Sequence, residues 1–445
     1  MDRDYQASAQ TQNRRKWAAW FLVLSILATV FADLHPDIAS FKSFWPSGLF
    51  ALAAALFLLP DTGRAQRIQL GILVTLGCVL LAIGVANGAE MDWPALLSQN
   101  TGLLTMVLTV GVLKLVITDQ IVIEEKLPVG RKAYFDTLLS VGLFGSVINI
   151  SAPILIADRL SLNRPLDYFS AGTIVRMFSL CASWSPFFAG TAVVLTAVGD
   201  IQLSSLMLGG LPLFLSSVAV LYWGGLLFKR ETVKQFRGYP LKPESLRVPI
   251  LLSILVFVSY MVVPGLSILT IIALASIVLT ASELIISKGI GQARDKFQEH
   301  IETQLPRSLN EVQLFLSAGI LASGLQSLVK IGWLEAPIDE FTGVTACLLL
   351  ASMIVIAALG IHPIIQIVAF TPLILSSDPN LELLGMTYLF SWALGTCGSP
   401  LSGTNLVMQG RFGIVAWRGA VQNWPYIGIM YCFACVILLL KAWLF

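Results

Sequence analysis

Two short runs of hydroxyl-bearing and small residues interrupt segments that are otherwise apolar enough to cross a membrane. They read Ser399-Pro400-Leu401-Ser402-Gly403-Thr404-Asn405 near the C-terminus and Ser185-Pro186-Phe187-Phe188-Ala189-Gly190-Thr191 earlier in the chain. Ser is a favoured N-cap and Pro suits the first helical position, so each Ser-Pro pair predicts the start of a new half-helix. Hydrocarbon tolerates a broken helix only where protein buries it or where it lines a cavity. Paired breaks of this kind indicate a transporter built from repeats.

Each break follows a segment with a polar tip and apolar arms. Asp136 to Ala157 carries the tip Gly145 to Pro153, and its basic flanks, Lys132 and Arg159, both favour the cytoplasm. A segment that begins and ends on one side predicts a re-entrant hairpin. Val344 to Leu375 is too long for one span and has Gly360-Ile361-His362-Pro363 at its middle, which predicts a second hairpin entered from outside. Hairpins entered from opposite sides indicate inverted repeats around a midplane site.

Half-helix starts are predicted at Pro153, Pro186, Pro363 and Pro400, and all four would direct free N–H groups and positive dipole ends at the centre of the protein. Such ends favour anions, by about 0.3 to 1 kcal/mol each when exposed. The residues predicted to bind substrate are Asn149, Ser151, Ser185, Thr191, His362, Ser399, Ser402, Thr404 and Asn405. Opposing carbonyls could hold sodium without a carboxylate, and this predicts sodium near Asn149, Ser185, Gly360 and Gly398. The alternative is that the Ser-Pro pairs only kink helices for packing.

His362 is an ionisable side chain inside a predicted membrane segment, which is a functional hypothesis by default. It could pair with an anionic substrate or carry a coupling proton, because its unperturbed pKa of about 6.5 lies in the physiological range. The alternative is a neutral histidine bonded to a carbonyl at the hairpin tip.

Composition places the chain among polytopic membrane proteins. Of its 445 residues, 56% are hydrophobic and only 12% are charged, which excludes an ordinary soluble protein. Lys and Arg cluster in alternate loops, beginning with Arg14, Arg15 and Lys16, so the positive-inside rule predicts a cytoplasmic N-terminus. The expected location is a bacterial-type inner membrane. The net charge of +2 gives no indication of nucleic-acid binding.

The order of the segments predicts an all-α protein with about eleven transmembrane spans, two re-entrant hairpins and two broken helices. We divide the chain into N-terminal scaffold spans (1–100), a first inverted repeat (101–228), a linker with two spans and a surface amphipathic helix (229–310), and a second inverted repeat (311–445). The first apolar run, Trp17 to Ala32, is interpreted as a retained signal anchor.

The pattern resembles the ion transporter superfamily, which includes the divalent anion:sodium symporters and the large membrane subunit of TRAP transporters. The run from Gly360 to Pro372 is similar to the second hairpin of the TRAP membrane subunit, and Ser399 to Leu406 is similar to the Pro-Pro-x-Gly-x-Asn run that follows it there. The chain departs from the family in two respects. It has no Ser-Asn-Thr, which the divalent anion:sodium symporters carry at both tips, and His362 stands where TRAP subunits have an acidic residue nearby.

The resemblance implies a homodimer in which a fixed scaffold carries a moving transport domain. With the predicted site, it favours a secondary active transporter of a small carboxylate-type anion, coupled to sodium or protons by an elevator mechanism. The alternatives are an exporter of an oxyanion or metalloid, or a sodium/proton antiporter of the same superfamily. An integral membrane enzyme is disfavoured because the sequence shows no convergent acids, bases or metal ligands, and no cofactor is expected. An auxiliary solute-binding protein cannot be inferred from one chain.

Overall fold

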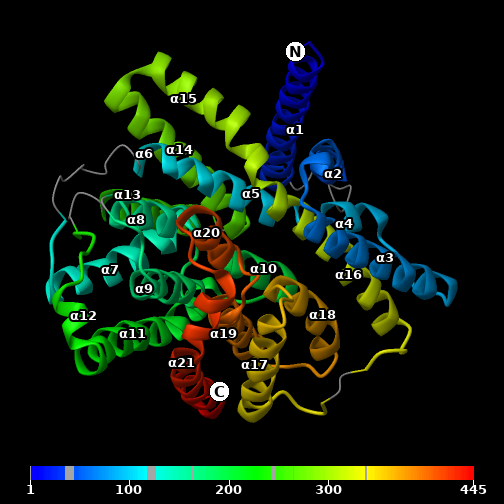
Figure 1. Cartoon of the computed structure of the whole chain (residues 1–445). Coiled ribbons are helices and arrows are strands. Elements are labelled where there is room, and N and C mark those ends of the chain that lie inside the picture. The colour runs from blue at the N-terminus through cyan, green and yellow to red at the C-terminus, as the bar shows by residue number, and fades with distance from the viewer. Residues whose placement is uncertain are drawn as a thin grey trace. The chain divides into compact units, whose positions relative to one another are not determined.

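The computed structural model describes residues 2–35, 45–117, 127–162, 164–241, 246–263, 265–335 and 338–444, and these are almost entirely helical (Figure 1). Within these ranges the structure has no strand, only an isolated antiparallel bridge between Val129 and Arg237. The chain forms two compact units, each built from two separate stretches. Unit 1 comprises residues 1–118 and 250–335, and unit 2 comprises residues 119–249 and 336–445.

Unit 1 contains the predicted N-terminal spans, most of the predicted linker region and the first helices of each predicted repeat. Its elements are α1 (Asp2–Leu34), α2 (Trp45–Leu58), η2 (Leu59–Asp61), α3 (Arg64–Ala86), α4 (Trp93–Ser98), α5 (Thr101–Val110), η3 (Gly111–Leu113), α6 (Lys114–Ile117), α14 (Ile268–Lys288), α15 (Ile290–Thr303), η7 (Leu305–Ser308) and α16 (Leu309–Lys330). Helix α13 (Arg247–Val262) begins in unit 2 and continues into unit 1.

The pairing of α3 with α16 in unit 1 depends on small residues. A Cβ added at Gly324 would lie 2.6 Å from the Gly77 carbonyl oxygen, and one at Gly77 would lie 2.8 Å from the carbonyl carbon of Ile320. Glycine at both positions therefore lets the two backbones approach closely, as small residues do between membrane helices.

Unit 2 contains all four predicted interruptions. Its elements are α7 (Arg131–Ile148), α8 (Ser151–Leu160), α9 (Tyr168–Ser179), η5 (Leu180–Ser183), α10 (Ala189–Val198), α11 (Leu203–Phe228), α12 (Arg230–Lys234), α17 (Gly343–Ala358), α18 (Pro363–Leu375), α19 (Leu381–Gly398), α20 (Gly403–Phe412) and α21 (Ala416–Leu444). Helix α19 forms the core of the unit. It is buried without interruption from Leu383 to Gly395, and α10, α17, α18 and α21 pack against it.

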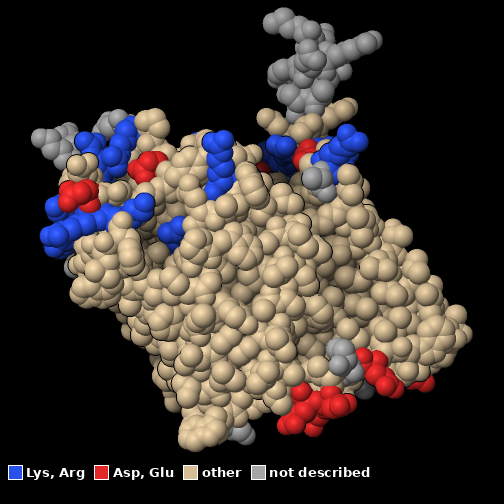
Figure 2. All heavy atoms as spheres, turned by 60° about the horizontal axis from the view of Figure 1, so that its bottom comes forward, with Lys and Arg blue, Asp and Glu red and all other residues tan. Residues whose placement is uncertain are grey.

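The helices confirm a polytopic helical membrane protein. Within the described ranges, seven helices are long and apolar enough to cross a membrane: Gln10–Leu34, Gln66–Ala86, Trp93–Ile117, Leu203–Phe228, Ile268–Lys288, Ile290–Lys330 and Ala416–Leu444. Five shorter apolar helices accompany them, and the count of eleven spans stays a prediction. In the view of Figure 2, charged side chains gather towards the edges of the face and a broad area between them carries none. Such a surface suits a lipid environment.

Candidate functional site

The first break separates η5 from α10 and is held by its own serine. The Ser185 side chain is fully buried, accepts the Phe187 backbone N–H at 3.1 Å and donates to the carbonyl of Ser146 on α7. Thr191, in the first turn of α10, donates its hydroxyl to the Ser185 carbonyl at 2.6 Å. Polar groups of the broken backbone are thus paired by side chains, as a buried interruption requires.

The first hairpin tip is joined to this break. Helices α7 and α8 pack against one another, with only Asn149 and Ile150 between them. Asn149 adopts a positive φ of 49° and donates its side-chain amide to the Phe187 carbonyl at 3.1 Å. The bonds from Asn149 and Ser185 therefore fasten the tip of one interruption to the turn of the other.

The second break, between α19 and α20, is held by two asparagines. Asn405 donates to the carbonyls of Ser399 at 2.9 Å and Cys397 at 3.4 Å, and Asn423 of α21 donates to the same Cys397 carbonyl at 3.0 Å. Ser402 accepts the Asn405 backbone N–H at 3.3 Å, so its side chain caps α20. The backbone carbonyls at the break therefore accept hydrogen bonds from side-chain amides.

The helix starts expected at the two Ser-Pro pairs are wrong by about three residues. Ser399 is the C-cap of α19, and α20 begins at Gly403 behind the N-cap Ser402. In the first half, α10 begins at Ala189 rather than at Pro186. In both places a short turn intervenes, with the Ser402 N–H bonded to the Ser399 carbonyl and the Phe188 N–H bonded to the Ser185 carbonyl. The Ser185 side chain bonds within its turn, and Ser399 takes part in its turn through its backbone carbonyl, so neither serine caps the helix that follows.

The second hairpin tip matches the prediction more closely. Helix α18 starts at Pro363 with His362 as its N-cap, and the histidine Nδ1 accepts the Ile364 N–H at 3.2 Å. Because Nδ1 is an acceptor there, the ring carries no proton on that nitrogen in this geometry. The ring also packs edge-on against Trp392, with centroids 5.2 Å apart. Nε2 has no hydrogen-bond partner within the described residues.

The four interruptions converge inside unit 2, and Trp392 of α19 lies among them. Helix α10 packs against both α18 and α19, and a Cβ added at Gly190 would lie 3.0 Å from the Trp392 ring. Glycine at position 360 places the second tip against Leu401 of the second break, and Gly403 of that break lies beside Ile150 of the first tip. Segments far apart in the sequence are thereby brought to one region.

The predicted site residues fall into two groups by what their side chains contact. Asn149, Ser185, Thr191, Ser402 and Asn405 bond to the backbone of the interruptions. In contrast, the described part of the chain supplies no hydrogen-bond partner to the hydroxyls of Ser151, Ser399 and Thr404. Ser399 and Thr404 are buried, and Ser151 and His362 are partly exposed. These four residues have polar atoms left for a ligand.

The two glycines predicted to lie near sodium differ in their surroundings. Gly360 has a φ of +98° at the second tip, whereas Gly398 is buried at the end of α19 against Ile427. The described residues include no group of three or more His, Cys, Asp or Glu that could hold a metal ion.

Two residues outside the predicted site take part in the arrangement: Arg176, for which the sequence favours snorkelling to the cytoplasmic surface, and Gln366, which carries no prediction. Arg176, near the end of α9, donates to the Asn423 side-chain oxygen and to the Gln422 carbonyl, both at 2.7 Å, so it supports the asparagine that holds the second break. Gln366 of α18 donates to the Ile361 carbonyl at 2.9 Å, while its own side-chain oxygen is buried and lacks a partner among the described residues. An arginine and a glutamine within apolar segments were the available signals.

Comparison with known proteins assigns no family: no protein-family model matches the chain, and no curated protein matches it in sequence.

Proposed function

We propose that the chain is a secondary active transporter of a small carboxylate-type anion and a member of the ion transporter superfamily. The observation that carries the proposal is the convergence of four helix interruptions, two from each half of the sequence, in one compact unit. Discontinuous helices that meet near the membrane midplane form the substrate sites of many transporters. Under this proposal the α7–α8 and α17–α18 pairs are re-entrant hairpins, and the protein has about eleven spans.

The hydroxyls of Ser151, Ser399 and Thr404 and the Nε2 of His362 are the proposed substrate contacts. They are neutral donors beside the starts of α8, α18 and α20, where helix N-termini favour negative charge. Sodium or protons supply the driving force in this proposal, and neutral oxygens around Asn149, Ser185 and Gly360 would hold sodium.

The division into two units supports an elevator mechanism. Unit 2 holds every interruption and would be the moving transport domain, while unit 1 would be the scaffold and the homodimer contact. In this mechanism the site travels with unit 2, so the bonds that hold the interruptions together remain intact through the cycle.

The test is ligand-induced stabilisation of the purified protein, followed by uptake into proteoliposomes. Acetate, succinate and citrate, each with sodium or with potassium, vary the number of carboxylates and the coupling ion separately. We expect at least one of them to raise the melting temperature and to enter proteoliposomes down an imposed sodium or proton gradient. Stabilisation and uptake by arsenite or another neutral acid, with none by carboxylates, would favour the metalloid exporter instead.

A further inference from the structure

Unit 1 contains a polar cavity of about 580 Å³ that lies apart from the helix interruptions. Its polar lining is Gln12, Arg15, Lys16, Asp61, Glu302, Thr303, Arg307 and Asn310, contributed by α1, η2, α15, η7 and α16. Its volume lies in the range of small-molecule sites in proteins.

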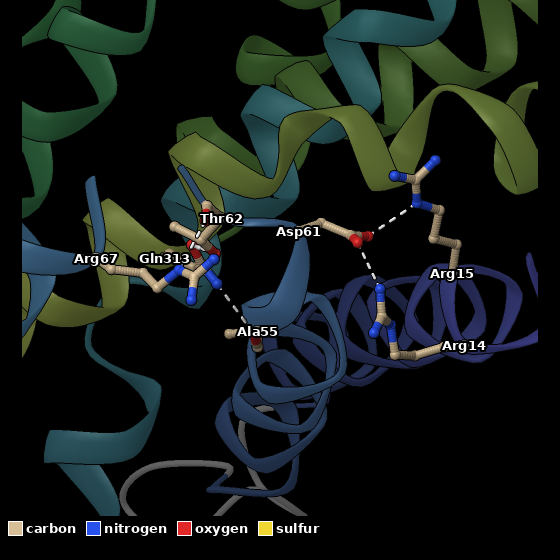
Figure 3. A network of polar contacts seen from close by, with 7 residues as sticks. All are labelled: Arg14, Arg15, Ala55, Asp61, Thr62, Arg67 and Gln313. Atoms are coloured by element: carbon tan, nitrogen blue, oxygen red, sulfur yellow. Dashed lines mark hydrogen bonds and ion pairs between the residues drawn. The ribbon is translucent and has the colours of Figure 1, made fainter. Parts of the chain in front are cut away.

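The carboxylates of this cavity are already paired with basic groups. Asp61 accepts from Arg14 and also from Arg15 Nε at 2.8 Å, as Figure 3 shows, and Glu302 accepts from Lys16 at 2.8 Å. The single positive charge of Arg14 already balances the negative charge of Asp61. The second arginine on that carboxylate leaves the cluster with more positive than negative charge.

Several N–H donors of the basic side chains remain for a ligand. Arg15 uses only Nε, and its two terminal nitrogens bond to no described residue. Arg307 makes a single long contact, 3.4 Å to the Gln304 side-chain oxygen. Arginine presents five N–H groups in a planar fork that matches phosphate geometry. The cavity thus offers two arginine forks and a lysine, with Arg15 and Lys16 from α1 and Arg307 from η7.

The turn that carries Asp61 is held in place from the other side. Thr62 donates its hydroxyl to the Gln313 side chain at 2.9 Å, Gln313 donates to the Ala55 carbonyl at 3.1 Å, and Arg67 donates to the Thr62 carbonyl at 2.8 Å (Figure 3). Asp61 is therefore a fixed anchor that orients Arg15.

The cavity lies where the chain enters its apolar stretch. Lys16 directly precedes Trp17 and the apolar part of α1, and Trp17 and Trp20 are 62% and 43% exposed. Exposed tryptophans and basic residues at the end of a span are typical of the headgroup level of a bilayer. Pro306 and Leu309 add apolar surface to the same cavity. A ligand with a phosphate and an attached apolar part would satisfy both kinds of lining.

We infer that this cavity binds the phosphate of an anionic phospholipid headgroup. Arg15, Lys16 and Arg307 contact the phosphate oxygens, and Asp61 and Glu302 orient two of these three side chains. Basic pockets between membrane helices on the cytoplasmic side bind anionic headgroups in this way. The inference is independent of the transported substrate, because it concerns unit 1 alone.

The test uses the full-length protein in nanodiscs, with phosphatidylcholine alone or with added phosphatidylglycerol. Native mass spectrometry of the protein released into detergent measures retained phosphatidylglycerol, and thermal unfolding measures stabilisation. We expect wild type to retain phosphatidylglycerol and the Arg307→Gln variant to bind it about ten-fold more weakly, since a charged hydrogen bond is lost. Arg307 is exposed and makes only one long contact, so this variant leaves the fold intact. An Arg15→Gln/Arg307→Gln double variant should lose retention.

Arg294→Gln is the matched control, because it removes the same charge from an exposed position on α15 outside the cavity lining. A third arm adds millimolar inorganic phosphate to phosphatidylcholine nanodiscs. Stabilisation by phosphate there, lost in Arg307→Gln, would show an anion site with a soluble ligand and overturn the lipid assignment. Equal retention of phosphatidylglycerol by wild type, Arg307→Gln and Arg294→Gln would overturn the site itself.

Discussion

The side-chain amide of Asn405 donates to the carbonyl of Ser399, six residues earlier, at 2.9 Å. In the first half of the chain, Thr191 donates to the carbonyl of Ser185 over the same separation, at 2.6 Å. Each half thus satisfies the carbonyl of its Ser-Pro serine with a side chain from the first turn of the next helix. This correspondence supports the proposal that the two halves are repeats.

Replacing Asn405 with alanine should destabilise the protein. The carbonyls of Cys397 and Ser399 would each lose one of two donors, keeping Asn423 and the Ser402 N–H respectively, and the net loss of a hydrogen bond costs about 0.5 to 1.5 kcal/mol. We expect a lower melting temperature together with reduced uptake in proteoliposomes. Asn87→Ala serves as control, because Asn87 also donates to a backbone carbonyl but is exposed. Equal melting temperatures for the two variants would contradict the role given to Asn405.

Replacing Thr404 with valine should reduce uptake without lowering stability. Valine keeps the volume of the side chain, and the threonine hydroxyl has no hydrogen-bond partner within the described ranges. If the hydroxyl binds an anionic substrate, its loss should weaken affinity roughly ten- to a hundred-fold. The measurement is the substrate concentration for half-maximal uptake beside thermal unfolding. Unchanged uptake would place the substrate away from α20.

Alanine at position 360 should disturb the second hairpin tip. Gly360 has a φ of +98°, which L-residues rarely adopt, and an added Cβ would lie 2.6 Å from Leu401 Cδ1. The left-handed conformation alone costs about 1 to 2 kcal/mol. Gly410→Ala is the control, since Gly410 lies within α20 and an added Cβ there has open space. Thermal unfolding should show a loss for Gly360→Ala only, and the reverse order would refute this account of the tip.

Arg176→Gln should destabilise unit 2 more than Arg411→Gln does. Arg176 bonds to Asn423, whose amide is buried at the second break, so its loss disturbs a connected network. Arg411 instead pairs with Asp158 through two bonds of 2.8 Å on the surface, and exposed pairs contribute about 0 to 1 kcal/mol. Denaturant unfolding of both variants gives the comparison. A larger effect of Arg411→Gln would show that the surface pair matters more.

Single cysteines at positions 200 and 234 should be labelled from opposite sides of the membrane. Helix α11, which lies between them, is one of the seven helices able to span a bilayer. The six native cysteines are free, so they must first be replaced. A membrane-impermeant maleimide applied to oriented vesicles should reach one position and leave the other protected. Labelling of both from one side would contradict a transmembrane α11.

Much of the helical order could be predicted from the sequence, because long apolar runs and polar interruptions are local signals. The apolar run from Leu203 to Phe228 is visible in the sequence and forms α11 with those same bounds, and the polar stretch after Lys288 contains α15. The helix starts at the two breaks could not be placed as well. Ser185 and Ser399 have the residue type of an N-cap, but the Ser185 hydroxyl donates to the distant Ser146 carbonyl, and the carbonyls of Ser185 and Ser399 accept from the side chains of Thr191 and Asn405.

The roles of individual side chains could not be predicted from local sequence patterns. Arg176 and Asn423 are bonded to one another although 247 residues separate them. Asn405 donates hydrogen bonds to backbone carbonyls, whereas the Thr404 hydroxyl has no partner among the described residues. Nothing in the spacing of the sequence distinguishes these two residues. The predicted division at 1–100, 101–228, 229–310 and 311–445 follows the linear order and stays a prediction, whereas the compact units join distant stretches.

The interleaving of the two units bears on how the protein is made. Unit 1 opens the chain but needs Ile250–Glu335 to be complete, and unit 2 is interrupted by that stretch and ends at the C-terminus. Neither unit can form its complete core until the ribosome has synthesised a large part of the second half of the chain. The first helices therefore lack some of their packing partners until later helices are synthesised. One example is α3, whose packing partner α16 comes more than 200 residues later in the chain. Cleavage of the chain just before Arg247 would give two fragments that each carry part of unit 1 and part of unit 2.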